Sequence, residues 1–431
     1  MENTDFDVLI IGAGAAGLAA AMRLSAAGRS VVVIEARDRI GGRILTMDAD
    51  GEPVELGAEF IHGRPPEIFD LINRFGLSAT PVGGDQFCNV AGKLCACDFF
   101  HEVDEVFDKL MHYRGPDISF EKFLRSVCEE ETTREWARGY VAGFHGAPPD
   151  DAGVEALIHD TKAEEEIDGQ RSWRIEGGYK RLIDRMWQAC EKSGVRLELN
   201  AHVERVEWGK GIRVFAGAKE FKAKRAIVTL PISMLQANAV TFTPPLNEKQ
   251  TALGGIAMGD VARCVLRFRR RWWEELNSKD GKSLKDASFL FSRGTDFPTW
   301  WTQAPVKMPI LVGWASAITA HALTRHSHEE VSAKAIGSLA TVLGVDESRI
   351  RSELVSTHFH DWCADPLTRG AYTYARVGGS GAYRSLAQPL RDTLFFAGEA
   401  TDITGNTGTV HGAVASGKRA AKEILSSVTQ F

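Results

Sequence analysis

Three glycines near the amino terminus have the spacing of a loop that binds phosphate. Gly12, Gly14 and Gly17 form a G-x-G-x-x-G string between the apolar run Val8–Ile11 and the alanine-rich segment Ala15–Ala27. In such a strand–turn–helix unit the first glycine permits a tight turn, the second lets backbone approach a pyrophosphate, and the third allows close helix–strand packing. The amino end of the helix then stabilises the anion. The alternative is a glycine turn in an α/β unit that binds nothing.

An acidic residue and a second glycine turn follow this motif. Glu35 ends the next apolar run, Val31–Ile34, where a carboxylate accepts hydrogen bonds from the ribose of a dinucleotide. Gly41-Gly42-Arg43 comes soon after, and Arg43 offers a planar fork of donors that suits phosphate. This second turn favours FAD, whose isoalloxazine must continue into the protein. The alternative is a surface turn with a solvated arginine.

Further motifs run through the chain in the order found in one protein family. They are Glu35-Ala36-Arg37, Leu56-Gly57-Ala58-Glu59-Phe60-Ile61-His62-Gly63, Gly177-Gly178-Tyr179, Trp362, Asp365-Pro366, Gly370-Ala371-Tyr372, Phe396-Ala397-Gly398-Glu399-Ala400-Thr401 and Thr409-Val410-His411-Gly412-Ala413. With the glycine motif, they make the sequence resemble the flavin-containing amine oxidases, on the polyamine oxidase and histone demethylase side. The resemblance implies FAD in an elongated tunnel, with its ring where an FAD domain meets a substrate domain.

The resemblance also implies which residues bind the cofactor. Glu35 would hold the adenosine ribose, Val203 would contact adenine through its backbone, and Glu399 would lie near the pyrophosphate and ribityl chain. The backbone N–H of Val410 would face the flavin pyrimidine edge, where negative charge builds on reduction. The full set comprises Gly12, Gly14, Ala15, Gly17, Glu35, Ala36, Arg37, Gly41, Gly42, Arg43, Gly57, Ala58, Glu59, Phe60, Val203, Trp362, Gly398, Glu399, Thr409 and Val410.

Four residues are candidates for the reacting centre. Tyr372 matches one wall of the aromatic cage of monoamine oxidases, whereas Thr409 stands at the other wall and leaves it open for longer or bulkier amines. His62 would lie beside the substrate amine, where it could accept a hydrogen bond or set the amine's protonation, or it could only cap its loop. Arg263 stands where the family usually has a lysine that binds a water near flavin N5. It could orient a water or be a satisfied strand arginine, but it cannot act as a base.

The resemblance implies oxidation of a polyamine-like or other bulky primary or secondary amine. Hydride would move to flavin N5, the imine would hydrolyse to a carbonyl product, and O₂ would be reduced to H₂O₂. FAD should be non-covalent, because Ala371 stands where covalent members carry cysteine before the aromatic residue. An L-amino-acid oxidase, with Arg174, Arg263 or Arg376 binding the carboxylate, and a desaturase-type flavin dehydrogenase are alternatives, as is a partner-binding protein with structural FAD.

The element pattern predicts an α/β chain with a Rossmann-like FAD-binding domain and an interleaved α+β substrate-binding domain. We expect the first from residues 1–80, 175–235 and 385–431, and the second from 81–174 and 236–384. Helices are expected at 66–76, within 101–145, and at 181–192, 328–343 and 410–425. Strands are expected at 195–199, 203–208, 212–215, 226–230, 261–268, 310–314, 352–359 and 393–397. The tryptophan pairs at 272–273 and 300–301 could line a cavity or pack in a core.

Composition narrows the possible partners of the protein and its cellular location. The 431 residues carry a net charge of −6, and the basic run Arg267-Phe268-Arg269-Arg270-Arg271 is short, so we expect no nucleic-acid partner. No apolar stretch reaches the roughly 18 residues of a membrane span. The seven cysteines show no metal-site spacing and are expected to be free thiols in a cytoplasmic protein with no metal. The oligomeric state is left open.

Overall fold

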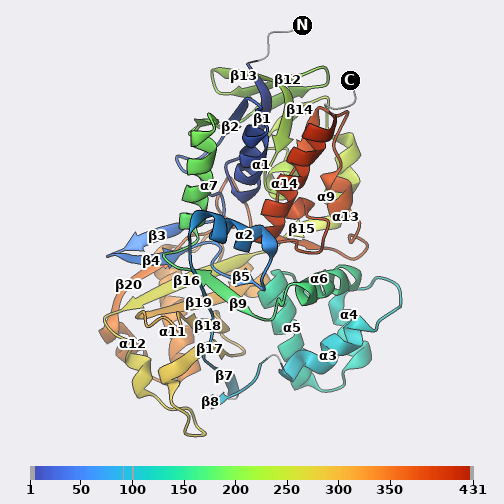
Figure 1. Cartoon of the computed structure of the whole chain (residues 1–431). Coiled ribbons are helices and arrows are strands. Elements are labelled where there is room, and N and C mark those ends of the chain that lie inside the picture. Colours follow the sequence, from blue (N-terminus) through green and yellow to red (C-terminus); the bar gives the residue numbers. More distant parts are fainter. Residues whose placement is uncertain (1–4, 91, 100, 428–431) are drawn as a thin grey trace.

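The computed structural model describes residues 5–90, 92–99 and 101–427. Its upper part in Figure 1 contains an eight-stranded sheet whose central strands are parallel. β1 (Phe6–Ile11) from Val8 onward and β2 (Val31–Ile34) throughout are buried apolar runs, as is typical of strands whose two faces are both covered. The sheet order is β10 (Arg196–Glu198), β2 (Val31–Ile34), β1 (Phe6–Ile11), β13 (Lys219–Val228), β12 (Ile212–Ala216), β11 (Arg205–Trp208) and β14 (Thr241–Thr243), with β22 (Leu394–Phe396) also paired to β13.

The register of the parallel strands brings their carboxyl ends to one edge. Ile11 pairs with both Ile34 and Val228, and Val228 also pairs with Phe396. The loops that follow β1, β2, β13 and β22 therefore begin side by side. Ligands of open α/β sheets bind at this edge.

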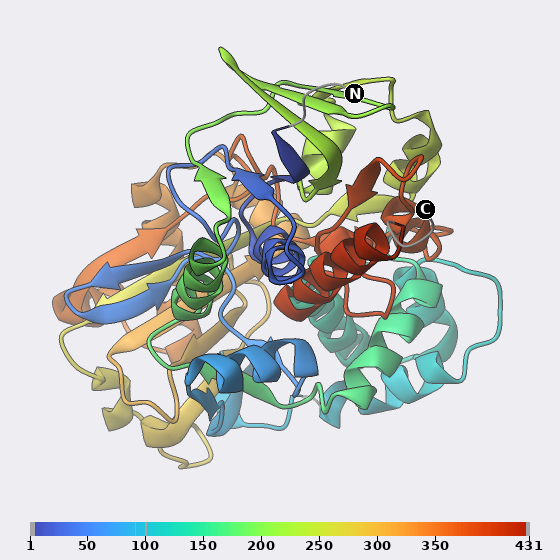
Figure 2. The ribbon, with the colours of Figure 1, turned by 45° about the horizontal axis from the view of Figure 1, so that its top comes forward.

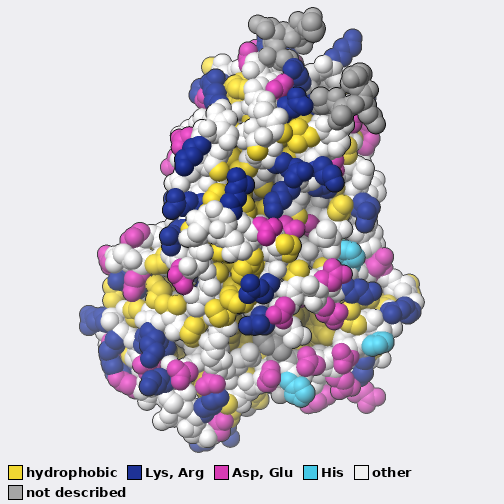
Figure 3. Space-filling model, in the orientation of Figure 1, with side chains coloured by type: hydrophobic (Ala, Val, Ile, Leu, Met, Phe, Trp, Pro, Cys, Tyr) yellow, Lys and Arg dark blue, Asp and Glu magenta, His cyan; other side chains and the backbone are white. Residues whose placement is uncertain are grey.

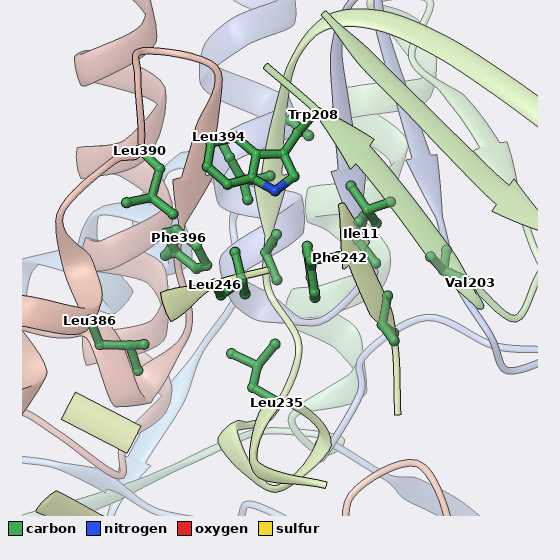
Figure 4. Close-up of a cluster of buried hydrophobic side chains, with 14 of the residues drawn as sticks. Ile11, Val203, Trp208, Leu235, Phe242, Leu246, Leu386, Leu390, Leu394 and Phe396 are labelled. Atoms are coloured by element: carbon green, nitrogen blue, oxygen red, sulfur yellow. The ribbon is translucent and has the colours of Figure 1, made fainter. Parts of the chain in front are cut away.

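Two long helices pack tightly on one face of this sheet (Figure 2). α1 (Ala15–Ala26) lies against α14 (Val410–Ser427), with α7 (Lys180–Lys192) on its other side. The close approach requires glycine, because a Cβ on Gly417 would lie 2.2 Å from the carbonyl oxygen of Ala16. The opposite face is covered by a large apolar cluster that includes Ile11, Trp208, Phe242, Leu386, Leu394 and Phe396 (Figure 4). Short helices α8 (Ile232–Gln236), α9 (Gln250–Gly255) and α13 (Ala382–Ala387) accompany it.

A second sheet of seven strands lies at the lower left of Figure 1. Its order is β20 (Leu354–Phe359), β16 (Val261–Phe268), β19 (Ile310–Ser316), β18 (Thr299–Thr302), β17 (Ala287–Phe291), β7 (Asp85–Val90) and β8 (Lys93–Ala96). All neighbours are antiparallel except β17 and β7. Helices α10 (Ala317–Leu323), α11 (His328–Leu343) and α12 (Glu347–Glu353) accompany this sheet. The tryptophan pairs Trp272–Trp273 and Trp300–Trp301 are buried, which fits core packing.

A helical part at the lower right of Figure 1 completes the molecule. It comprises α3 (His101–Met111), α4 (Phe120–Val127), α5 (Glu131–His145) and α6 (Val154–Glu166). Smaller elements join the three parts: the pair β3 (Thr46–Ala49) and β4 (Glu52–Glu55), the three strands β5 (Ile61–His62), β9 (Ser172–Ile175) and β6 (Ala79–Pro81), the pair β15 (Ile256–Met258) and β21 (Thr373–Ala375), and α2 (Pro66–Phe75).

The α/β fold class with a discontinuous dinucleotide-type sheet is confirmed. Residues 6–34, 196–228 and 394–396 all contribute strands to the first sheet. The domain boundaries remain a prediction, and β14 pairs with β11 although it lies inside the predicted segment 236–384. On the face shown in Figure 3, basic and acidic side chains are interspersed. Among the described residues, no helix combines the length and apolar character needed to cross a bilayer.

The expectation of seven free thiols is wrong for two cysteines. Cys88 and Cys97 form a disulfide, while the other five remain thiols. No sequence pattern indicates this pairing, because it depends on the antiparallel register of β7 and β8. Cys88 lies opposite Cys95 in that hairpin, and Cys97 is two residues further along the same chain.

Thiol titration tests this pairing. The protein unfolded in denaturant without reductant should react with a thiol reagent at five cysteines, and at seven after reduction. Cys88→Ser should raise the first number to six, since it frees Cys97. Seven reactive thiols before reduction would contradict the disulfide.

Candidate active site

The glycine loop after β1 has the geometry of a pyrophosphate cradle. Gly12 has a φ of +110°, and a Cβ there would lie 2.4 Å from the hydroxyl oxygen of Thr229. A Cβ on Gly17 would lie 2.0 Å from the carbonyl oxygen of Gly12, so helix and strand touch at this point. A Cβ on Gly14, in contrast, would meet nothing within 4 Å. Gly14 therefore borders open space while its neighbours are packed.

The amino end of α1 faces that space without a protein cap. Gly14 is its N-cap residue, no side chain caps the helix, and its first turn has no acidic residue. First-turn N–H groups have no intrahelical partner and carry the positive end of the helix dipole. An anion is the ligand that fits here.

Glu35 is held in place to receive a hydroxyl-rich ligand. Its side chain is buried, with Oε2 accepting from the N–H of Ala13 at 2.8 Å and Oε1 accepting from the N–H of Arg37 at 2.9 Å. Each carboxylate oxygen retains a further lone pair for a ribose hydroxyl. Ala36 lies between these residues, and Val203 is buried in the same part of the molecule.

Arg37 has a protein partner for its guanidinium. Nη2 donates to Asp365 at 2.9 Å, and His360 lies 2.9 Å from the other carboxylate oxygen. Burial alone would raise the pKa of Asp365, but His360 and Arg37 outweigh it and hold this pKa well below its usual range. The Arg37 side chain therefore connects its own loop to the segment around Asp365. Contact between Arg37 and the cofactor remains a prediction.

Arg43 joins several site segments. Its Nη1 donates to Glu399 at 2.8 Å and to the carbonyl of Ala371 at 2.6 Å, while its own carbonyl accepts from Ala58 at 3.3 Å. Glu399 also accepts from the hydroxyl of Thr373 at 2.6 Å and from the N–H of Gly408 at 3.1 Å. A narrow pocket beside these residues is lined by Arg43, Val228, Leu230, Pro231, Gly398 and Glu399.

Together these features fit a dinucleotide such as FAD. Open space in front of an uncapped helix suits the pyrophosphate, and the Glu35 carboxylate suits the ribose. Isolated bridge pairing of Gly14 with Gly41 brings the second glycine turn against the first. A Cβ on Gly42 would lie 3.4 Å from the Cα of Gly14.

Tyr372 lies between two glycine-containing turns. Cβ atoms on Gly146 and Gly408 would lie 3.3 Å and 3.2 Å from its ring, so both turns leave room for it. The hydroxyl donates to the carbonyl of Phe144 at 3.0 Å. Burial raises the pKa of this hydroxyl, so it stays protonated and can donate this hydrogen bond.

His62 on β5 lies among aromatic rings. Its ring centroid is 6.1 Å from those of Phe60 and Phe144, and Nδ1 lies 3.4 Å from the hydroxyl of Ser172. Burial lowers the pKa of His62 to about 4. The imidazole is therefore neutral at pH 7, which suits a hydrogen-bond acceptor rather than a charged group. Burial and His62 likewise lower the pKa of His411 to about 3.

Thr409 caps α14. Its hydroxyl donates to the carbonyl of Asn406 at 2.6 Å and accepts from the N–H of Gly412 at 3.0 Å. The first-turn N–H of Val410 has no intrahelical acceptor and is the kind of group that binds an anionic ring edge. The Thr409 side chain thus has a structural role besides the wall position predicted for it.

Arg263 forms a buried ion pair instead of facing open space. It is 4% exposed, Nη2 binds Glu59, and Nη1 donates to the carbonyl of Gly57 at 3.3 Å. Both Nη atoms thus have protein partners, but the buried Nε has no hydrogen-bond partner among the described residues, so the water-orienting role and the strand-arginine role both remain predictions. Trp362 is also buried, and its indole N–H donates to the carbonyl of Leu56 at 2.7 Å.

Sequence reasoning missed several residues at this centre. Phe144 and His411 reach His62 from α5 and α14, and Gln303 binds Glu59. Trp301, which was expected to line a cavity or pack in a core, also binds Glu59. His411 belongs to the motif Thr409-Val410-His411-Gly412-Ala413, so the sequence carried a signal for it. Phe144 and Gln303 carried no local signal, because only the tertiary fold brings them to the site.

Comparison with known proteins defines the class. The family model described as flavin containing amine oxidoreductase matches residues 15–132 and 128–425. Polyamine oxidase 3 of Oryza sativa subsp. japonica is 30% identical over 96% of this chain and 88% of its own. The chain belongs to the flavin-containing amine oxidoreductases, and FAD is the dinucleotide of the site.

Two further relatives place the chain within that family. Lysine-specific histone demethylase 1 homolog 3 of Arabidopsis thaliana is 26% identical over 97% of this chain but only 30% of its own length. A triple mutant from a redesign of cofactor binding in putrescine oxidase is 25% identical and superimposes with a TM-score of 0.84, covering 98% of this chain and 99% of that one. The resemblance to the polyamine oxidase and histone demethylase branch is confirmed.

Two glycine variants should separate folding from cofactor binding. Gly17→Val places a side chain against the Gly12 carbonyl and should lower the unfolding temperature of the apoprotein sharply. Gly14→Val projects into open space, so the apoprotein should unfold near the wild-type temperature while FAD affinity falls at least about tenfold, a loss of ~1.4 kcal/mol. Thermal unfolding and flavin titration measure both. Stoichiometric FAD at wild-type affinity in Gly14→Val would contradict the cradle.

The titration of His62 tests its environment. The lowered pKa means that the unfolded chain binds more protons than the folded one between about pH 4 and 6.5, so this group destabilises the fold as pH falls through that window. In histidine-labelled protein, the resonance lost in His62→Ala should titrate near pH 4. A midpoint near 6.5 would place His62 in water.

Proposed function

We propose that the protein catalyses FAD-dependent oxidation of a primary or secondary amine, of polyamine-like or other bulky type. The observation that carries the proposal is the neutral His62 beside Phe60 and Phe144, near the segments that fit FAD. Such a site suits an uncharged amine: aromatic surface surrounds its carbon chain, and one imidazole nitrogen accepts its N–H. A neutral amine nitrogen is also the form that can release hydride from the adjacent carbon.

Each site residue has a limited task. Tyr372, fixed by its bond to the Phe144 carbonyl, aligns the carbon–nitrogen bond, and alignment alone lowers barriers by several kcal/mol. His62 orients the amine by accepting a hydrogen bond from the amine N–H, and the surrounding rings exclude water. Bound FAD supplies the two-electron acceptor. Overall, amine, O₂ and water give a carbonyl compound, the released ammonia or smaller amine, and H₂O₂.

The arginines disfavour an amino-acid oxidase. Arg174 and Arg263 both bind Glu59, and Arg376 lies 3.5 Å from Asp151 with about half of its side chain exposed. A substrate carboxylate would have to displace one of these partners. Simple amines make no such demand, so they are the preferred substrate class. Ala371 before Tyr372 supports non-covalent FAD.

Anaerobic mixing with a panel of amines tests the proposal. Diamines, N-alkylated polyamines and cyclic amines should bleach the flavin absorbance, while the corresponding amino acids should not, and admission of air should restore the colour with H₂O₂. Tyr372→Ala with full FAD content should be bleached about tenfold more slowly, a loss of ~1.4 kcal/mol of barrier lowering. No bleaching by any amine, or faster bleaching by amino acids, would overturn the assignment.

A further inference from the structure

Glu59 is the centre of a buried charge cluster that the proposed reaction does not use. Its side chain is 2% exposed, and it pairs with the guanidiniums of Arg263 and Arg174. The indole N–H of Trp301 donates to it at 3.1 Å, and the amide of Gln303 donates at 3.2 Å. We call Glu59, Arg263 and Arg174 the Glu59 cluster.

The Glu59 cluster has one positive charge more than negative charge. Burial alone would raise the pKa of Glu59, but Arg263 and Arg174 outweigh it and lower this pKa to about 2, so the carboxylate is ionised. The nearby Glu55 accepts from Thr46 and Tyr179, and burial raises its pKa to about 7. At pH 6 Glu55 is therefore mostly neutral, and two guanidiniums face one carboxylate.

Hydrogen bonds connect the cluster to a segment that is predicted to bind the cofactor. Arg263 donates to the carbonyl of Gly57, and Ala58 donates to the carbonyl of Arg43, which also binds Glu399 through its guanidinium. Arg174 stacks over the Phe60 ring at 4.7 Å. Gly57 and Ala58 therefore connect the cluster to Arg43, one of the groups that fit FAD.

We propose that the Glu59 cluster sets the reduction potential of the bound FAD, its excess positive charge favouring the reduced form. The inference rests on the cofactor-binding residues of the proposed function. A flavin gains two electrons and becomes more negative on reduction, and charges in a low-dielectric interior act over longer distances than in water. A fixed positive charge that is connected through Gly57 and Ala58 to the groups that fit FAD therefore stabilises the reduced state more than the oxidised state.

Opposite charge changes should move the potential in opposite directions. Arg174→Met brings the cluster toward neutrality and should shift the equilibrium at least tenfold toward oxidised flavin, about 30 mV lower for a two-electron couple. Glu59→Gln removes the negative charge and should shift it at least tenfold the other way. Arg263→Lys keeps the charge and should change the equilibrium less than twofold. Structural damage alone would not shift the equilibrium between oxidised and reduced flavin in opposite directions for opposite changes of charge.

Arg267→Met is the matched control. Arg267 lies on the same strand, β16, but pairs with Asp50 and Glu52 away from the cluster. Its removal should leave the potential within a twofold change of the equilibrium. The holoenzymes are reduced slowly without oxygen at pH 6 in the presence of a reference dye, and absorbance gives the ratio of oxidised to reduced flavin.

The possible outcomes separate this inference from the proposed function. Shifts of the same sign in Arg174→Met and Glu59→Gln, or no shift in either, would overturn it even if amines still bleach the wild-type flavin. If amines fail to bleach the flavin but the opposite shifts appear, the inference holds and the substrate assignment fails. If Glu59→Gln does not fold, Arg174→Met and Arg263→Lys still decide, because Glu59 keeps one guanidinium partner in each.

Discussion

Arg43 is the residue on which the assembly of the site depends. Its carbonyl accepts a hydrogen bond from the N–H of Ala58, and its guanidinium binds Glu399 and the carbonyl of Ala371. Arg43 therefore joins segments that lie more than 300 residues apart in sequence. These segments are the loop after β2, the stretch between β4 and β5, the stretch before β21 and the loop between β22 and α14. The part that fits the dinucleotide and the part that fits the amine are thus fixed to each other at one side chain.

Charge pairing is the second constraint on this interior. Glu59, Asp365 and Glu399 are all buried, and each meets a guanidinium. Removing one partner of a buried pair typically costs about 3–5 kcal/mol, because the remaining charge is left without compensation. The three pairs therefore specify which segments must come together. Neutral groups near them, such as His62 and Tyr372, leave an apolar surface for a substrate.

Close backbone contacts set the geometry around these pairs. Gly12, Gly17 and Gly417 lie where a Cβ would overlap a neighbouring side chain or backbone atom, which brings α1 against β1 and α14. Gly14 lies among them but borders open space. The same short motif thus serves both packing and ligand approach, and this division of tasks is visible only in three dimensions.

The sequence by itself determined the elements whose signals are local. The β1–α1–β2 unit follows from apolar runs and glycine spacing, and β16 and α11 have the bounds that their apolar patterns predict. The tertiary structure decided the partners of polar and sulfur-containing side chains. Arg263 and Glu59 are 204 residues apart, the Cys88–Cys97 bond depends on a hairpin register, and the Thr409 hydroxyl caps a helix. A residue's type states which bonds it can form, but only the folded chain brings one particular partner within reach.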